Sequence, residues 1–474
     1  MRTATSIPVP QSIRSQGIVE LDAEAPSVNG RAALPPRAGL TLAAGTFSTA
    51  GFRDLSAPRV VPGCAGDHPG IHQLLSAVFH APTRDAFYSS LDDPYYEPRD
   101  RLLVKRGDRI IAHLHLTKRV MHFGPMMLPV SGLSWICTLP EFRGLGFARQ
   151  LLRTADRTMA ADGAMLGLLS TKLPHFFRPA GWAVCGRQSQ AHAGTRELLA
   201  QLSAMALPPA EGAFNIRPLR QMELSSVMRL YARATERSIG PFERSEAYWR
   251  WLVSRKGFDQ VLIAIDGPDR LELDGSGSPI VGYAVTRGES IVELVVDPDH
   301  PSAAEQLLAR ACGEAIERDD HAVQLHAPPG ERLFGLFQAA SGTLHQTEAH
   351  QGEVFMVKLL DPAGFLRLLL GELNVRSEAT ALERPCELGL HVEDRKYRLA
   401  VSRRSVKLTL NKLGRSYLRM NLAEFTRLLL GHLDLHEAVA SGRVTSSTRL
   451  ALEIGQVLFP RLPLWRPPFD DLTG

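Results

Sequence analysis

The chain has few cysteines and no block of charge of one sign. The five cysteines are Cys64, Cys137, Cys185, Cys312 and Cys386, an odd and scattered set that has neither metal-ligand spacing nor the pattern of a disulfide framework. We therefore expect no metal and a reduced, cytoplasmic setting. The 54 basic and 50 acidic residues leave a formal net charge of +4, which does not indicate a nucleic-acid-binding protein.

The sequence also lacks any run of the roughly 18 apolar residues that a membrane helix needs. The first residues, "MRTATSIPVPQSIRSQG", have no continuous apolar segment, so a secretory signal peptide is not indicated. Residues 1–54 are rich in Ser, Pro, Ala and Gly without a hydrophobic period, and we expect a disordered N-terminal tail. The 474 residues are enough for about three domains.

Two stretches share one pattern, in which an apolar run is followed by a turn and a helix. The first reads "PEFRGLGFARQLLRTA" from Pro140, and the second reads "PDHPSAAEQLLARA" from Pro298. Similar elements surround both stretches in the same order. This internal duplication predicts two domains of one fold. Apolar residues of the first helix share one face, and Gly163 is expected to end it as a left-handed cap.

Only the first copy keeps residues that suit an anion. The first amides of a helix have no internal partners, and the helix dipole favours negative charge there. Gly144 and Gly146 allow the backbone to approach a phosphate, and Arg143 adds a positive charge. The second copy has Pro301, which offers no N–H, and no glycine in its turn. The alternative is that the glycines only make a tight turn before the helix.

A third region begins near Asp361. Its stretch "CELGLHVEDRKYRLAVSRRSVKLTLN" alternates apolar and polar residues strictly. The apolar positions are Cys386, Leu388, Leu390, Val392, Tyr397, Leu399, Val401, Val406, Leu408 and Leu410. This period of two predicts an antiparallel sheet with one buried face, flanked by helices.

The spacing Arg143-x-x-Gly146-x-Ala148 resembles the signature of the GCN5-related N-acetyltransferases, the GNAT superfamily. After the tail, the order of elements is similar to that of the Eis (enhanced intracellular survival) group. The resemblance implies an α+β fold with two tandem GNAT-type domains, each a mixed, mainly antiparallel sheet flanked by helices. A sterol-carrier-protein-like α/β domain would follow. The implied limits are 1–54 for the tail, 55–205 for the acetyl-CoA-binding domain, 206–358 for the degenerate copy and 359–474 for the last domain and C-terminal tail.

The same resemblance implies an acetyl-CoA-dependent N-acetyltransferase that transfers an acyl group to the amine of a small molecule or peptide. Acetyl-CoA would be the cosubstrate, and no metal, nucleic acid or membrane would take part. Relatives of this group assemble, so we expect a homo-oligomer, a trimer or a hexamer. The alternative is a non-catalytic acyl-CoA-binding or assembly protein.

The resemblance places the coenzyme at the first motif. The pyrophosphate would lie on backbone amides at the start of the helix, and the pantetheine arm would pair with the end of the preceding strand, where an amide would also stabilise the oxyanion. The implied cofactor-binding residues are Ile136, Thr138, Arg143, Gly144, Leu145, Gly146, Phe147 and Ala148.

The catalytic residues are harder to assign from the resemblance. In Eis-like enzymes a tyrosine in a segment of the form [IF]YxRxG[YFW] protonates the leaving thiolate, and here Phe177 occupies that position in "FFRPAGW". Phenylalanine has no proton to give, so water or another group such as His175 would replace it, unless this copy is impaired. These enzymes also use their C-terminal carboxylate as a base, which would be that of Gly474. Trp465 and Phe469 could anchor such a tail, or the tail could lie on the surface.

Two further groups stay open. His113 and His115 alternate on one face of a strand. One of them could act as a base, or both could be ordinary residues of the sheet. The segment "DDPYYEP" (92–98) would either hold a cationic amine or form a solvated acidic loop.

Overall fold

The structure is a computed structural model that describes residues 59–186, 188–204, 213–269, 280–350, 352–380 and 382–471. The predicted N-terminal tail, 1–54, and the predicted base Gly474 lie outside the described residues. The described part forms a mixed α/β fold with three sheets. None of its helices is both long and apolar enough to cross a membrane.

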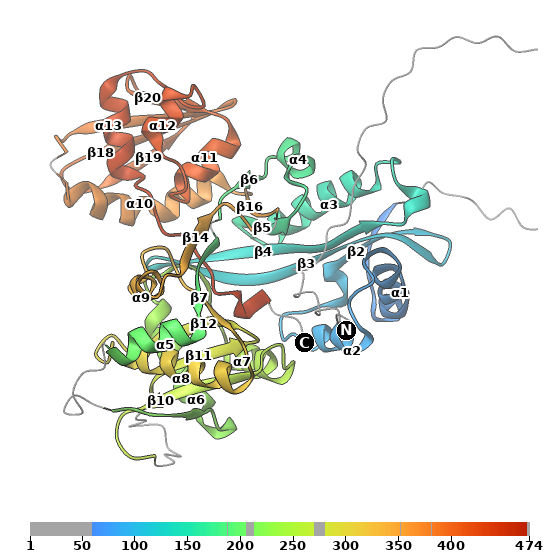
Figure 1. Ribbon diagram of the computed structural model, residues 1–474. Coiled ribbons are helices and arrows are strands. Elements are labelled where there is room, and N and C mark those ends of the chain that lie inside the picture. The colour runs from blue at the N-terminus through green and yellow to red at the C-terminus, as the bar shows by residue number, and fades with distance from the viewer. Residues whose placement is uncertain are drawn as a thin grey trace, which may run out of the picture.

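The first sheet follows the order β1-β2-β3-β4-β5-β16-β15, with β6 on β16 and β9 on β3. Helices α3 and α4 lie on one face of this sheet, and α1 and α2 lie on the other (Figure 1). The strands are β1 (Val60–Pro62), β2 (Arg101–Arg106), β3 (Arg109–Phe123), β4 (Met126–Thr138), β5 (Leu166–Thr171), β6 (Ala183–Val184), β9 (Ile239–Phe242), β15 (Ala349–His350) and β16 (Glu353–Leu359). The helices and helical turns are η1 (Ala65–Asp67), α1 (His68–Phe79), α2 (Arg84–Leu91), η2 (Pro98–Asp100), η3 (Pro140–Phe142), α3 (Phe147–Ala161), α4 (Pro174–Phe177) and η4 (Arg178–Ala180).

The second sheet follows the order β14-β7-β13-β12-β11-β10-β8 and repeats the arrangement of the first. Its strands are β7 (Gln188–Gly194), β8 (Asn215–Pro218), β10 (Gln260–Ile265), β11 (Ile280–Arg287), β12 (Ser290–Val296), β13 (Ala322–His326) and β14 (Thr343–Thr347). Its helices are α5 (Thr195–Ala204), η5 (Gln221–Glu223), α6 (Leu224–Thr235), α7 (Glu246–Ser254), α8 (Ala303–Glu317) and α9 (Phe334–Ala339).

The third sheet confirms most of the predicted alternation. Leu388, Leu390 and Val392 are at most 2% exposed, and so are Leu399 and Val401 on the next strand. The pattern weakens along β19, where Val406 is 6% exposed but Leu410, the last residue of the strand, is 36% exposed. The strands are β17 (Cys386–Val392), β18 (Arg395–Val401), β19 (Val406–Leu410), β20 (Tyr417–Met420) and β21 (Thr445–Ser446). The helices are α10 (Pro362–Glu378), α11 (Leu422–Leu429), α12 (Leu435–Ala440) and α13 (Arg449–Leu458), and the chain then returns to the second half with the helical turn η6 (Pro468–Asp471). The likeness of this region to sterol carrier proteins stays a prediction.

The first two sheets exchange strands. β7 follows the first sheet's elements in sequence but pairs with β13 of the second sheet, with Ala191 opposite Leu325. β16 follows the second sheet's elements but pairs with β5 of the first, with Met356 opposite Leu169. The two halves are therefore interlocked. The predicted limits, 55–205 and 206–358, did not include this exchange of strands.

Helix α3 has the amphipathic pattern expected from the sequence. Leu151, Ala155 and Met159 are at most 1% exposed and pack on the first sheet. Gly163 adopts the left-handed conformation (φ +81°) that was predicted for the cap, and it follows the C-cap residue Asp162. The helix therefore presents its N-terminus at the end of β4.

Candidate active site

The first notable feature is a gap between two parallel strands. β4 and β5 pair at three positions only, from Val130–Leu166 to Gly132–Leu168. β4 then continues to Thr138 and β5 to Thr171, but the two strands no longer pair with each other. The structure describes every residue of both strands. The strands diverge beyond Gly132, so the β5-facing edge of the last residues of β4 is left without a strand partner.

β4 carries a bulge where the strands diverge. On β3, His113 pairs with Cys137 and His115 pairs with Ser134, so Trp135 and Ile136 together oppose one residue. Trp135 has a positive φ of 53°, which a bulky side chain rarely adopts. The peptide group between Trp135 and Ile136 is thus turned out of the regular ladder.

The turn between β4 and α3 is built as the sequence predicts. Gly144 and Gly146 have φ values of 75° and 80°, which favour glycine. A Cβ at Gly146 would meet no atom within 4 Å, so the space in front of the helix is open. Among the described residues, the amides of 144–149 have no hydrogen-bond acceptor. Six consecutive free donors at a helix N-terminus suit a phosphate group.

The predicted site residues divide into backbone and side-chain contributors. Phe147 and Ala148 have buried side chains, so only their amides face the open space. Leu145 is 60% exposed, and Arg143 is half-buried with its Nε 3.4 Å from the carbonyl oxygen of Thr138. The Oγ1 of Thr138 is buried and has no partner in the described residues. Ile136 is 1% exposed and lies at the bulge.

The corresponding helix of the second sheet, α8, uses its N-terminus internally. The amides of Ala303 and Ala304 donate to the carbonyls of His300 and Pro301, at 3.1 and 3.2 Å. Arg332 also donates to the carbonyl of Pro301 and pairs with Glu305. Donors that the first copy leaves free are therefore occupied here.

His113 lies beneath the bulge, fully buried, with both ring nitrogens in use. Its Nδ1 is 2.8 Å from the carbonyl oxygen of Trp135, and its Nε2 is 3.2 Å from Nη1 of Arg101. A guanidinium only donates, so Nε2 accepts and Nδ1 carries the proton. Burial, together with the charge of Arg101, lowers the pKa of His113 to about 3.

Arg101 is 1% exposed and connects His113 to a polar cluster below α1 and α2. Its Nε donates to the hydroxyl of Tyr96 at 3.2 Å, and that hydroxyl is 2.8 Å from Nε2 of His68. The guanidinium also lies over the ring of Phe87, 4.9 Å from its centroid. Sequence patterns had not singled out Arg101, because an arginine that begins an apolar strand gives no signal of its own.

His115 lies beside this cluster. Its Nδ1 is 3.3 Å from Oγ of Ser134, and burial with the nearby charge of Arg101 holds its pKa well below the usual value. Both His113 and His115 are therefore weak bases in the folded protein, and neither suits the role of a general base near neutral pH.

The buried histidines should make the protein sensitive to acid. The unfolded chain protonates a histidine below about pH 6.5, whereas folded His113 stays neutral until about pH 3. The unfolded state binds more protons in this window, so the free energy of unfolding falls as the pH falls through it. We expect the thermal midpoint of the wild type to drop more between about pH 7.5 and about pH 5 than that of His113→Asn.

The test is the comparison between the wild type and His113→Asn, because Glu353 changes the pH dependence of stability in the opposite direction in both. Burial raises the pKa of Glu353 to about 7, which favours folding as the pH falls. Glu353 is present in both proteins and cancels. Equal slopes in the two proteins would contradict the assignment of His113 as a buried neutral histidine.

The other predicted catalytic residues lie on α4 or outside the described residues. Phe177 is fully buried between Phe176 and Trp182, with ring centroids 5.0 and 6.2 Å away. His175 is exposed on the short helix α4. Their roles stay predictions, as does that of Gly474.

The acidic segment 92–98 is largely neutralised by basic side chains. Asp93 is buried and pairs with Arg119, while Lys118 lies 3.6 Å from Glu97. Lys118 also lies 2.9 Å from Asp100, just beyond the segment. A cationic amine would find little unpaired negative charge there.

The C-terminal segment is inserted into the core of the second half. Phe469 is 1% exposed and its ring centroid lies 6.0 Å from that of Trp249, which confirms Phe469 as an anchor. Trp465 is half-buried, and its amide donates to the carbonyl of Ile239 at 3.0 Å.

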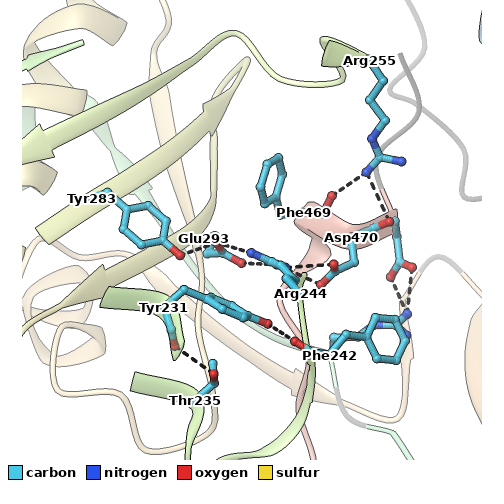
Figure 2. A network of polar contacts seen from close by, with 11 residues as sticks. Tyr231, Thr235, Phe242, Arg244, Arg255, Tyr283, Glu293, Phe469 and Asp470 are labelled. Atoms are coloured by element: carbon cyan, nitrogen blue, oxygen red, sulfur yellow. Dashed lines mark hydrogen bonds and ion pairs between the residues drawn. The ribbon is translucent and has the colours of Figure 1, made fainter. Parts of the chain in front are cut away.

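A buried arginine fixes this segment (Figure 2). The guanidinium of Arg244 donates to both carboxylate oxygens of Glu293, at 2.9 and 2.6 Å, and to both of Asp470, at 3.0 and 2.9 Å. All three side chains are at most 2% exposed. Tyr283 donates to Glu293 at 2.7 Å and completes the network. No group of acidic, histidine or cysteine side chains in the described residues could hold a metal ion.

Residues 62–185 match the family model described as Acetyltransferase (GNAT) domain. This part of the chain therefore carries a GNAT acetyltransferase domain, which indicates an acyltransferase. No curated protein matches the sequence.

Three solved structures share the fold across most of the chain. A GCN5-related N-acetyltransferase from Kribbella flavida is 16% identical at a TM-score of 0.67, covering 87% of this chain and 98% of its own. One from Anabaena variabilis is 15% identical at 0.66, covering 86% and 99%. Eis1 from Mycobacterium abscessus is 14% identical at 0.57, covering 87% and 99%. The chain thus has an Eis-like fold over nearly the whole length of these proteins.

Proposed function

We propose that the acetyltransferase domain of this chain transfers the acetyl group of acetyl-CoA to an amine. The observation that carries the proposal is the row of free amides, 144–149, at the N-terminus of α3 beside the gap between β4 and β5. The acetyltransferase domain match over residues 62–185 supports the same reaction class.

The residues of the first motif suit the parts of a coenzyme A molecule. The free amides would hold the pyrophosphate, and Arg143 would add a positive charge next to them. The β5-facing edge of β4 from Ile136 to Thr138 would pair with the amide groups of pantetheine. The buried Oγ1 of Thr138, which has no partner in the described residues, gives this edge a further polar group for a ligand.

The reaction joins the amine nitrogen to the thioester carbonyl carbon and breaks the bond from that carbon to sulfur. The amine loses a proton and the leaving thiolate gains one. In the tetrahedral intermediate, the negative charge on the carbonyl oxygen would be stabilised by the amide of Ile136 at the bulge.

The proton transfers need groups other than the buried histidines. An alkylamine has a pKa of about 10, so the acceptor must lose a proton before attack. The carboxylate of Gly474 is our candidate base, three residues beyond Asp471, the last residue that the structure describes. Phe177 is fully buried and has no proton to give to the thiolate. We therefore propose that a water molecule in the gap protonates the thiolate.

Thiol release from acetyl-CoA is the direct test, measured across polyamines, aminoglycosides and lysine peptides. We expect amine-dependent release with at least one class, and one coenzyme A site per chain by calorimetry. Coenzyme A binding without amine-dependent release would favour the rival function, a non-catalytic acyl-CoA-binding protein, for which Phe177 is the favouring observation. Two sites per chain would contradict the assignment of the second copy as unable to bind.

A further inference from the structure

We infer that His113 and Arg101 are positioning residues that aim the amide of Ile136 at the reacting carbonyl. The inference rests on the proposed function. It begins from the bulge on β4, where the side chain of His113 binds the carbonyl of Trp135 at 2.8 Å.

The geometry of one peptide group fixes the direction of this amide. The peptide bond is planar and trans, so the carbonyl of Trp135 and the N–H of Ile136 point in opposite directions. The sheet order places β3 on one side of β4 and β5 on the other. Because the carbonyl of Trp135 is bound by the side chain of His113, the N–H of Ile136 points away from that side chain. It does so at the level where β4 and β5 have diverged.

Arg101 fixes the proton of His113. Its Nη1 lies 3.2 Å from Nε2 and can only donate, which forces the proton to Nδ1, facing the carbonyl of Trp135. In the other tautomer, a lone pair of Nδ1 would face the lone pairs of this carbonyl, and the contact would be repulsive. Arg101 in turn contacts the hydroxyl of Tyr96 and the ring of Phe87, and these contacts fix the position of its guanidinium.

The second copy keeps a bulge on the corresponding strand but not the positive φ. On β11, Val285 pairs with Glu293 and Thr286 pairs with Ile291, so β12 has an extra residue, Val292, at this point. No residue of β12 has a positive φ. The half whose first helix amides are occupied therefore has a bulge without the backbone conformation of Trp135.

Three substitutions of His113 separate the contribution of its Nδ1 contact from that of its Nε2 contact. In His113→Asn the amide nitrogen can replace Nδ1 and still donate to the carbonyl of Trp135. In His113→Gln the amide reaches the place of Nε2 and cannot make this bond, although it can still accept from Arg101. His113→Leu removes both contacts.

Acetyl-CoA with a ¹³C-labelled thioester carbonyl provides the decisive readout. In the wild type we expect the bound carbonyl resonance to move downfield, because it accepts a hydrogen bond. This shift should persist in His113→Asn and disappear in His113→Gln and His113→Leu. The turnover number should fall on the order of a hundredfold in His113→Gln and His113→Leu, and within about tenfold in His113→Asn.

Affinity for coenzyme A separates this inference from the proposed function. The amides of 144–149 are untouched, so the dissociation constant should change less than about threefold in all three variants. If the wild type binds no acetyl-CoA, the proposed function fails. The positioning role is wrong if all three variants bind acetyl-CoA and if His113→Asn and His113→Gln have the same turnover number and the same carbonyl shift. Should His113→Leu not fold, the Asn–Gln pair still decides.

Discussion

Gly146→Asp is expected to weaken coenzyme A binding on the order of a hundredfold while the protein stays folded. The φ of 80° at this position is tolerated by aspartate better than by most residues, and no atom lies within 4 Å of the added Cβ. A carboxylate at a helix N-terminus even stabilises the free protein. It would, however, stand where the pyrophosphate is proposed to bind. Two like charges about 5 Å apart at an effective dielectric of about 20 repel by roughly 3 kcal/mol, on the order of a hundredfold in affinity.

Gly146→Asn is the matched control, because asparagine has the shape of aspartate without its charge. We expect calorimetry to show clearly weaker binding for the aspartate variant than for the asparagine variant. Ser302→Asp places the same charge at the N-terminus of α8 in the second copy and should leave coenzyme A binding unchanged. Wild-type affinity in Gly146→Asp would exclude the first motif as the coenzyme site.

Arg244→Met should cause the largest loss of stability among single substitutions in the second half. It leaves the carboxylates of Glu293 and Asp470 buried side by side without their positive partner, and breaking a buried ion pair in this way costs about 3–5 kcal/mol. The thermal midpoint should fall by roughly 10 °C. The C-terminal segment should also become sensitive to proteolysis, since Asp470 is its main polar attachment.

Arg250→Met is the control for this experiment. Arg250 also pairs with a glutamate in the second half, but its side chain is 72% exposed and that of Glu246 is 61% exposed. An exposed pair contributes little, so the midpoint should hardly change. The triple variant Arg244→Met, Glu293→Leu, Asp470→Leu should be more stable than Arg244→Met alone, since no unpaired charge remains. A triple variant less stable than the single one would show that packing around Arg244 matters more than its charge.

The local features of the site could be predicted because they depend on neighbouring residues. Gly144 and Gly146 mark a turn that needs positive φ, and the period of Leu151, Ala155 and Met159 gives the buried face of α3. In each case the physical cause lies within a few positions of the residue concerned. The burial of Phe469 is different, because its partner Trp249 lies far away in the sequence, and the sequence only offers an aromatic residue in a proline-rich segment.

The arrangement around His113 could not be predicted in this way. Its partner Arg101 lies on another strand, and the carbonyl that it binds belongs to a bulge that no sequence pattern marks. The sequence shows two histidines on one face, which is equally compatible with a base and with a sheet residue. Only the enclosure of the ring and its two contacts decide that it is a neutral hydrogen-bond donor.

The exchange of β7 and β16 sets the order in which the protein can fold during synthesis. β5 forms the middle of the first sheet, yet its neighbour β16 begins only at Glu353, after the entire second half has been made. Until then, one edge of β5 is unpaired and open to pairing with other chains. A fragment that ends near residue 205 would keep the coenzyme motif but lack the strand that completes its sheet. We therefore expect the chain to be most prone to aggregation at this stage of synthesis.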